Sequence, residues 1–259
     1  MPSFGPITSL ALSLRYITTE ESYTSLRDAL MALISLTHLE LQILAFFRSP
    51  STLPITLPGL QILEVDVRRC TCKDGKDGKN IINSIHATSL ISLALKWNDS
   101  DADLTGSTSD ESRIPSLRHL LLFGPTVFSE LDWLARMFPN IERLTCWAGA
   151  DVHVILAAIG EGADDGSDGG PEVSDGLRWP KLHSIGALGI DPKIPFESFN
   201  LVVLRDAISK LQECGRPFHT LWCLQSSFAR ANKSDMAELR EIIHVADFSD
   251  DWPLPFNFQ

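Results

Sequence analysis

The sequence lacks any run of about eighteen apolar residues, and its first ten residues, MPSFGPITSL, carry no basic cluster before an apolar stretch. We therefore expect no membrane-spanning helix and no secretory signal peptide. Cysteine is also scarce, with five residues in a chain of 259, and an odd, scattered set favours reduced thiols over a disulfide framework. We therefore expect an intracellular protein, cytoplasmic or nuclear.

Basic residues are in deficit, because 22 Lys and Arg face 33 Asp and Glu, which gives a formal net charge of -11. A field of this sign repels phosphate backbones and anionic lipid, so we expect neither a nucleic-acid partner nor a membrane partner. A hydrophobic content of 44% and a charged content of 21% are typical of a chain that buries a full core.

Motifs that carry catalysis are missing, since the sequence contains no G-x-S-x-G, no H-E-x-x-H and no Walker G-x-x-x-x-G-K-[ST]. We expect no catalytic residues and no enzymatic activity. Gly160, Gly162 and Gly166 are spaced like a phosphate loop, but Asp164 and Asp165 between them would repel a phosphate. We interpret this stretch as a linker and expect no cofactor.

Metal-binding patterns are incomplete. The alternating aspartates of Asp99–Asp103 resemble the start of a calcium loop, but Leu104 stands where the turn needs glycine and Asp110 replaces the bidentate Glu. Cys70 and Cys72 form C-x-C without a second pair at zinc-site spacing. We expect no metal site.

What the sequence does contain is a repeated pattern of leucines. SLTHLELQIL, Ser35–Leu44, and SLRHLLLFG, Ser116–Gly124, both follow L-x-x-L-x-L. Six further copies carry conservative replacements: Ile7/Leu10/Leu12, Leu60/Leu63/Val65, Leu90/Leu93/Leu95, Ile141/Leu144/Cys146, Leu182/Ile185/Ala187 and Phe218/Leu221/Cys223. Five of the seven spacings between middle positions are 24 to 30 residues, close to the period of leucine-rich repeats.

Between these patterns, three segments carry helical periodicity: Glu20–Leu33, Ser129–Phe138 and Leu201–Cys214. Ser129 is a candidate N-cap and Gly215 a candidate C-terminal cap. A unit of strand, outer helix and strand cannot bury its own apolar face, so neighbours must stack. The sequence predicts an α/β leucine-rich-repeat solenoid: a curved horseshoe with a parallel β-sheet on the concave face and helices and loops outside. An ordinary α/β protein with leucine-rich parallel strands is the alternative.

The remaining polar stretches read as insertions into a single domain that spans 1–259 and has about eight degenerate repeats. Gly160–Gly176 is rich in Gly and Asp and predicts a flexible acidic loop, and without it the longest spacing becomes an ordinary repeat. Asn98–Ser112 and Lys73–Asn80 are expected to be surface loops. We expect a C-terminal tail or cap at 245–259.

Two residue types recur at fixed repeat positions. Cys146 and Cys223 take the third apolar position of their strands, where a thiol behaves as a small buried hydrophobe. His38 and His119 share one exposed strand position in two repeats. We interpret the cysteines as core residues, and the histidines as a coincidence of repeat position rather than a paired site.

The phrases LTHLELQ, LPGLQILEVD, SLRHLLLFG, RWPKLHSIGAL and ISKLQECGRPFHTLWC resemble the degenerate leucine-rich-repeat halves of fungal F-box-type proteins, over about Ile7 to Gln225. The resemblance implies the substrate-recognition half of an adaptor that brings targets to a cullin-type ubiquitin ligase. An F-box would precede the repeats, and because the first strand pattern begins at Ile7, we expect none within this chain. Ubiquitin-ligase subunits are therefore expected partners only if an F-box lies upstream.

These observations predict a non-enzymatic protein–protein interaction module, with a protein of unknown identity as its partner. An inhibitor or regulatory scaffold of leucine-rich-repeat type, unrelated to ubiquitin, is the alternative, and an uncharacterised enzyme is a distant third. Fold resemblance alone does not decide between them.

The predicted concave face changes character along the repeats. Its first three repeats offer polar and acidic residues such as His38, Glu40, Gln42, Glu64 and Asp66. The later repeats offer an aromatic, Arg and apolar stripe typical of interface hot spots. The partner-binding residues predicted there are Leu121, Phe123, Arg143, Trp147, Leu188, Trp222 and Leu224. Two alternatives remain open: the tail folds back over the stripe, or Phe123 and Trp147 turn into the core.

Overall fold

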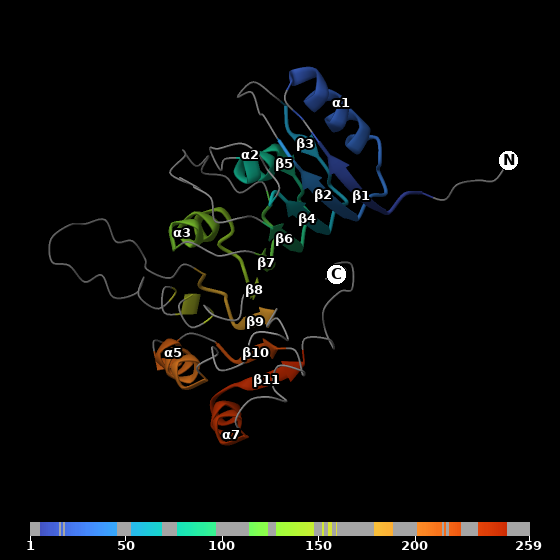
Figure 1. Cartoon of the computed structure of the whole chain (residues 1–259). Coiled ribbons are helices and arrows are strands. Elements are labelled where there is room, and N and C mark those ends of the chain that lie inside the picture. The colour runs from blue at the N-terminus through green and yellow to red at the C-terminus, as the bar shows by residue number, and fades with distance from the viewer. Residues whose placement is uncertain are drawn as a thin grey trace. The chain divides into compact units, whose positions relative to one another are not determined.

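The computed structural model describes residues 6–15, 17, 19–45, 53–68, 77–96, 114–123, 128–147, 152, 155–156, 159, 179–188, 201–213, 215, 218–223 and 233–247; the side chains of 77–79, 128–130, 132, 147, 187 and 188 are not described (Figure 1). The described residues fall into two compact units, one within Met1–Pro125 and one within Thr126–Leu254. Each unit is an α/β arrangement built on parallel strands.

The first unit contains a parallel sheet in which neighbours in sequence are neighbours in space. Its five strands are β1 (Ser9–Leu14), β2 (His38–Ile43), β4 (Ile62–Asp66), β6 (Ser92–Lys96) and β7 (His119–Phe123). The middle leucines of the pattern stand side by side, in the register Leu10, Leu39, Leu63, Leu93 and Leu120. The strand predicted for each of these five L-x-x-L-x-L patterns is confirmed.

One face of this sheet forms the core because side chains alternate between the two faces of a strand. Leu39, Leu63, Leu93 and Leu120 are each 0% exposed. The equivalent leucines of β1 are only half-buried, since this strand pairs with β2 on one side alone. The edge strand therefore contributes less apolar burial than the inner strands.

Helix α1 (Glu20–Met31) connects β1 and β2, and its start is fixed by a capping box. The Thr19 hydroxyl accepts a hydrogen bond from the Ser22 backbone N–H at 3.1 Å, and the Thr19 N–H donates to the Ser22 hydroxyl at 3.2 Å. Tyr23 and Leu30 on its inner face are buried. The helix predicted at Glu20–Leu33 is confirmed, two residues shorter at its end.

The chain adds one short strand between β2 and β4, and a helix with a second short strand between β4 and β6. The strands β3 (Ile55–Thr56) and β5 (Ile85–His86) pair in parallel in a sheet of their own. Helix α2 (Asp77–Ser84) precedes β5, so the surface loop predicted at Lys73–Asn80 is wrong for its last four residues. The apolar positions Ile81 and Ile82 lie in the core, which gives this short helix its amphipathic character.

The second unit repeats the strand–helix alternation. Its parallel strands are β8 (Arg143–Trp147), β9 (Ser184–Leu188), β10 (Thr220–Cys223) and β11 (His244–Asp247), and its helices are α3 (Phe128–Met137), α5 (Leu201–Glu213) and α7 (Lys233–Ile242). Gly215 follows α5 with φ 77, a left-handed conformation that glycine adopts without strain, and its N–H bonds the Gln212 carbonyl at 2.9 Å. The predicted C-terminal cap is confirmed.

Other predictions have mixed outcomes. The first three residues of the C-terminal tail or cap expected at 245–259 belong to β11. The loops expected at Gly160–Gly176 and Asn98–Ser112, and the rest of the tail, lie outside the described residues. Helix α3 starts at Phe128, so Ser129 lies within it and not at its N-cap. Within the described part of the chain, no helix is long and apolar enough to cross a membrane.

Candidate functional site: the polar face of the first sheet

The face opposite the leucine core of the first unit carries polar side chains in rows, because the strands are in register. We call it the polar face; its first row is Ser9, His38, Ile62, Ser92 and His119, its second is Ala11, Glu40, Glu64, Ala94 and Leu121, and its third is Ser13, Gln42, Asp66, Lys96 and Phe123. The second and third rows end at β7 in the apolar residues Leu121 and Phe123, whereas the first ends in His119. Equivalent repeat positions thus become spatial neighbours.

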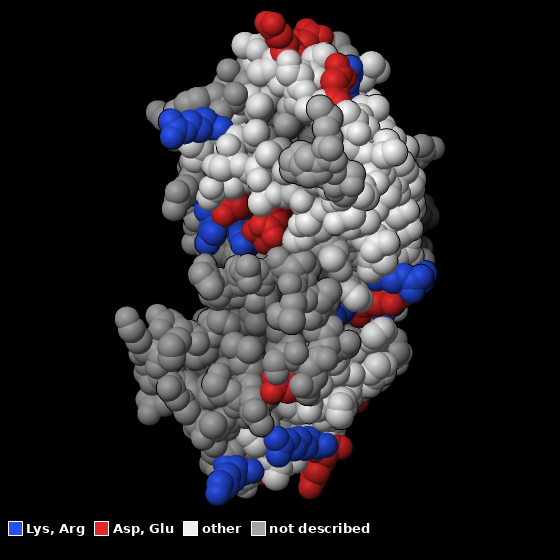
Figure 2. All heavy atoms as spheres, turned by 90° about the vertical axis from the view of Figure 1, so that its right-hand side faces the viewer, with Lys and Arg blue, Asp and Glu red and all other residues white. Residues whose placement is uncertain are grey.

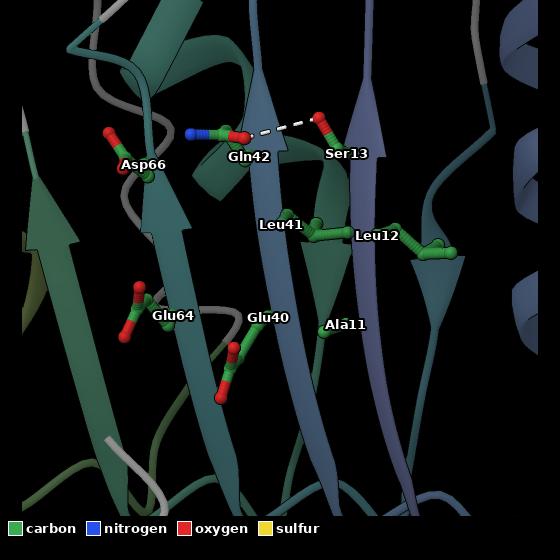
Figure 3. A pocket seen from close by; sticks show the side chains of 8 residues that line it. All are labelled: Ala11, Leu12, Ser13, Glu40, Leu41, Gln42, Glu64 and Asp66. Atoms are coloured by element: carbon green, nitrogen blue, oxygen red, sulfur yellow. Dashed lines mark hydrogen bonds between the residues drawn. The ribbon is translucent and has the colours of Figure 1, made fainter. Parts of the chain in front are cut away.

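Strands β1, β2 and β4 surround a shallow pocket of about 310 Å³ on this face. Glu40 and Glu64 stand directly opposite each other on adjacent strands, and Ser13 donates a hydrogen bond to the Gln42 side-chain oxygen at 3.1 Å (Figure 3). Ala11, Leu12, Leu41 and Asp66 complete the lining. The pocket therefore combines carboxylates, an amide and a hydroxyl with an apolar border.

Lys96 on β6 compensates part of this negative charge. Its Nζ donates to the Glu64 carboxylate at 2.5 Å, and it lies 5.1 Å from the centre of the Phe123 ring, a cation–π distance. Glu64 is itself buried. A buried carboxylate needs such a partner, since an uncompensated charge away from water is costly.

Asp66, at the end of β4, is held by Arg68. The Arg68 guanidinium donates to both carboxylate oxygens, at 2.8 and 3.1 Å, and the Arg68 backbone N–H donates at 3.0 Å. Burial alone would raise the pKa of Asp66, but the hydrogen bonds and charge of Arg68 outweigh it and hold that pKa below its ordinary value. The hydrogen bond to Asp66 in turn raises the pKa of Arg68, against the opposing effect of its burial.

The two repeat-position histidines belong to separate Ser–His pairs. Ser9 lies 3.2 Å from His38 Nδ1, and Ser92 lies 3.3 Å from His119 Nδ1. His38 Nε2 also approaches the Glu40 carboxylate at 3.2 Å. Strands β4 and β6 separate the two histidines, so the sequence was right not to join them in one site.

The second unit contains a different cluster on the equivalent face of its strands. The Arg143 guanidinium carbon lies 4.2 Å from the centre of the Trp222 ring, and the Trp222 indole N–H donates to the Ser184 hydroxyl at 2.6 Å. Gly186 is the residue of β9 in register with Trp222. Because glycine has no side chain, the Trp222 ring has room to cross β9 towards Arg143.

The described members of the predicted partner-binding stripe are buried or half-buried. Leu121, Phe123 and Arg143 are 0%, 6% and 5% exposed, and the first two lie in the rows of the polar face. Trp222 is half-buried. Leu224 and the side chains of Trp147 and Leu188 lie outside the description, so the binding role of the stripe stays a prediction.

The two cysteines predicted to be core residues are confirmed, because Cys146 and Cys223 are both buried as free thiols. Burial raises the pKa of the Cys146 thiol to about 12. A thiol in this environment stays protonated at neutral pH and is a poor nucleophile. Cys146 therefore acts in packing.

On the side of the molecule drawn in Figure 2, the described Lys, Arg, Asp and Glu residues gather in small groups, several of both signs. The sequence did not single out Lys96, Arg68 or Ser184, although aligning the repeats by their leucines would have placed Lys96 in the third row.

Comparisons with known proteins supply no family. No protein-family model matches the chain, and no curated protein matches it. The candidate face is therefore defined by the geometry of its own residues.

Proposed function

We propose that the chain is a non-enzymatic protein-binding module of leucine-rich-repeat type, and that the polar face of the first unit contacts its partner. The register of the strands carries this proposal. Each strand places its pattern leucines on one side and the residues between them on the other, at matching positions from strand to strand. On β1 and β2 these opposite-face residues are exposed or half-exposed. The open part of this surface, on β1 and β2, is mostly polar, which suits recognition of another protein.

The resemblance to the repeat halves of F-box-type proteins supports a more specific role as the substrate-recognition part of a ubiquitin-ligase adaptor. A regulatory scaffold or inhibitor unrelated to ubiquitin would use the same face. The two roles predict different co-purifying proteins. An adaptor co-purifies with cullin-ligase subunits if it is expressed together with an F-box encoded upstream in its gene. A scaffold or inhibitor does not.

Quantitative affinity purification with matched variants tests the binding role. Ser13→Arg with Gln42→Arg adds two bulky cations to the polar face, where Ser13 is exposed and Gln42 half-exposed. Ser25→Arg with Ala29→Arg adds the same charge to exposed positions of α1. We expect the face variant alone to lose the partners that the wild type captures. Equal capture by both variants, with melting temperatures unchanged, would contradict the proposal.

A further inference from the structure

Glu40 and Glu64 form a like-charged pair across two strands. Residues directly opposite each other on neighbouring strands are close enough to interact, and two like charges there are destabilising. Lys96 bonds Glu64 and is placed on β6, the far side of β4 from Glu40. The Glu40 carboxylate lies 3.2 Å from His38 Nε2 on its own strand. The pair breaks a local rule of sheet stability, and such breaks gather at functional positions.

The pocket beside this pair opens on the polar face and contains groups that accept hydrogen bonds in several directions. The Glu40 and Glu64 carboxylates line it from two strands, with Gln42 above them (Figure 3). Leu12, Leu41 and Ala11 add apolar surface. A long side chain with an apolar stem and a cationic end matches this lining.

Arginine fits better than lysine for a geometric reason. The guanidinium is a planar fork with five donors and can bond two carboxylates at once, whereas the lysine ammonium is a compact point charge with a strong hold on water. The formal net charge of -11 adds a long-range field that draws a basic partner towards the chain.

We propose that the polar face docks an extended segment of a partner protein that carries an arginine, whose guanidinium lies between the Glu40 and Glu64 carboxylates. This inference rests on the proposed function and names the chemistry of the partner. The charge-assisted bonds supply specificity, and Ser13 and Gln42 contact the flanking backbone.

A random dodecapeptide display library, selected on the full chain, tests the inference. We expect the recovered peptides to be rich in arginine. Binding of a synthetic copy of a selected peptide should weaken about tenfold or more in Glu40→Gln, which removes one charge-assisted partner and keeps the side-chain shape. Glu241→Gln, which removes a charge from an exposed position on α7, is the matched control and should change nothing. A peptide whose arginine is replaced by citrulline should bind the wild-type protein as weakly as the original peptide binds Glu40→Gln.

The remaining outcomes distinguish failure of the arginine inference from failure of the proposed function. Peptides that bind the wild type and Glu40→Gln equally, but not the Ser13→Arg, Gln42→Arg variant, would overturn the arginine inference and leave the proposed function standing. Peptides whose binding is unchanged by every substitution on the polar face would count against both the arginine inference and the proposed function. Failure to enrich any peptide over a heat-denatured control would overturn the inference alone, because the capture experiment tests the function independently.

Discussion

The guanidinium carbon of Arg143 lies 4.2 Å from the centre of the Trp222 ring, although the two residues belong to strands separated by β9. Gly186, the β9 residue in register with Trp222, has no side chain to obstruct the ring, which is anchored by its hydrogen bond to Ser184. This contact links β8, β9 and β10 on the face opposite the leucine core. Both residues belong to the predicted partner-binding stripe, and their contact braces the second unit.

Trp222→Ala should therefore destabilise the protein, by about 2 to 4 kcal/mol, because it removes the packing of a half-buried ring together with the cation–π contact. Trp222→Phe keeps the ring and loses the bond to Ser184, so a smaller loss of about 1 kcal/mol is expected. Urea denaturation followed by circular dichroism measures both values. Equal losses in the free energy of unfolding for the two variants would show that the packing of the ring contributes nothing to stability.

Lys96→Met should lower the free energy of unfolding at neutral pH by about 3 kcal/mol, since it leaves the Glu64 carboxylate buried without its cation. Adding Glu64→Gln to Lys96→Met should restore much of that loss. A double-mutant cycle on these two positions gives the coupling energy directly. A coupling energy near zero would mean that the bond between Lys96 and Glu64 is not formed in solution.

Acid should weaken the fold in part through Asp66. The pKa of Asp66 is lowered in the folded state by Arg68, so at pH values between the folded and unfolded pKa the unfolded chain binds more protons. The stabilisation is present above the unfolded pKa, near 4 for an ordinary aspartate, and is lost as pH falls through the lower folded value. Asp66→Asn should remove this part of the acid sensitivity when denaturation midpoints are compared from pH 7 to pH 2. Asp206→Asn, at an exposed position of α5, is the control and should retain it.

The edge and the centre of the first sheet should differ in stability. Leu120→Ala removes a fully buried side chain and is expected to cost about 2 to 5 kcal/mol, whereas Leu12→Ala on β1 should cost less because that side chain is half-exposed. Backbone amides of Leu10–Leu14 should also exchange with deuterium sooner than those of Leu120–Leu122, since an edge strand opens more readily. Equal protection of the two strands would contradict this account of the edge.

The leucine pattern predicted eight strands because each pattern combines period-two alternation with a buried middle residue, as Leu63 and Leu144 illustrate. It missed β11 for a visible reason: Asp247 is in register with Cys223, at the position where other strands place an apolar residue. The diagonal contacts of Lys96 with Glu64 and of Trp222 with Ser184 were also missed. They join adjacent rows, and the repeat spacing fixes the rows but not the side-chain directions.

The proposal that the polar face binds a partner is tested most directly by carboxyl footprinting of the chain, free and in complex with a captured partner. Glu40 is half-exposed on the face and Glu241 is exposed on α7, so a carbodiimide-coupled amine should label both in the free protein. We predict that the partner protects Glu40 and leaves the labelling of Glu241 unchanged. Undiminished labelling of Glu40 in the complex would contradict the proposal and place the interface elsewhere.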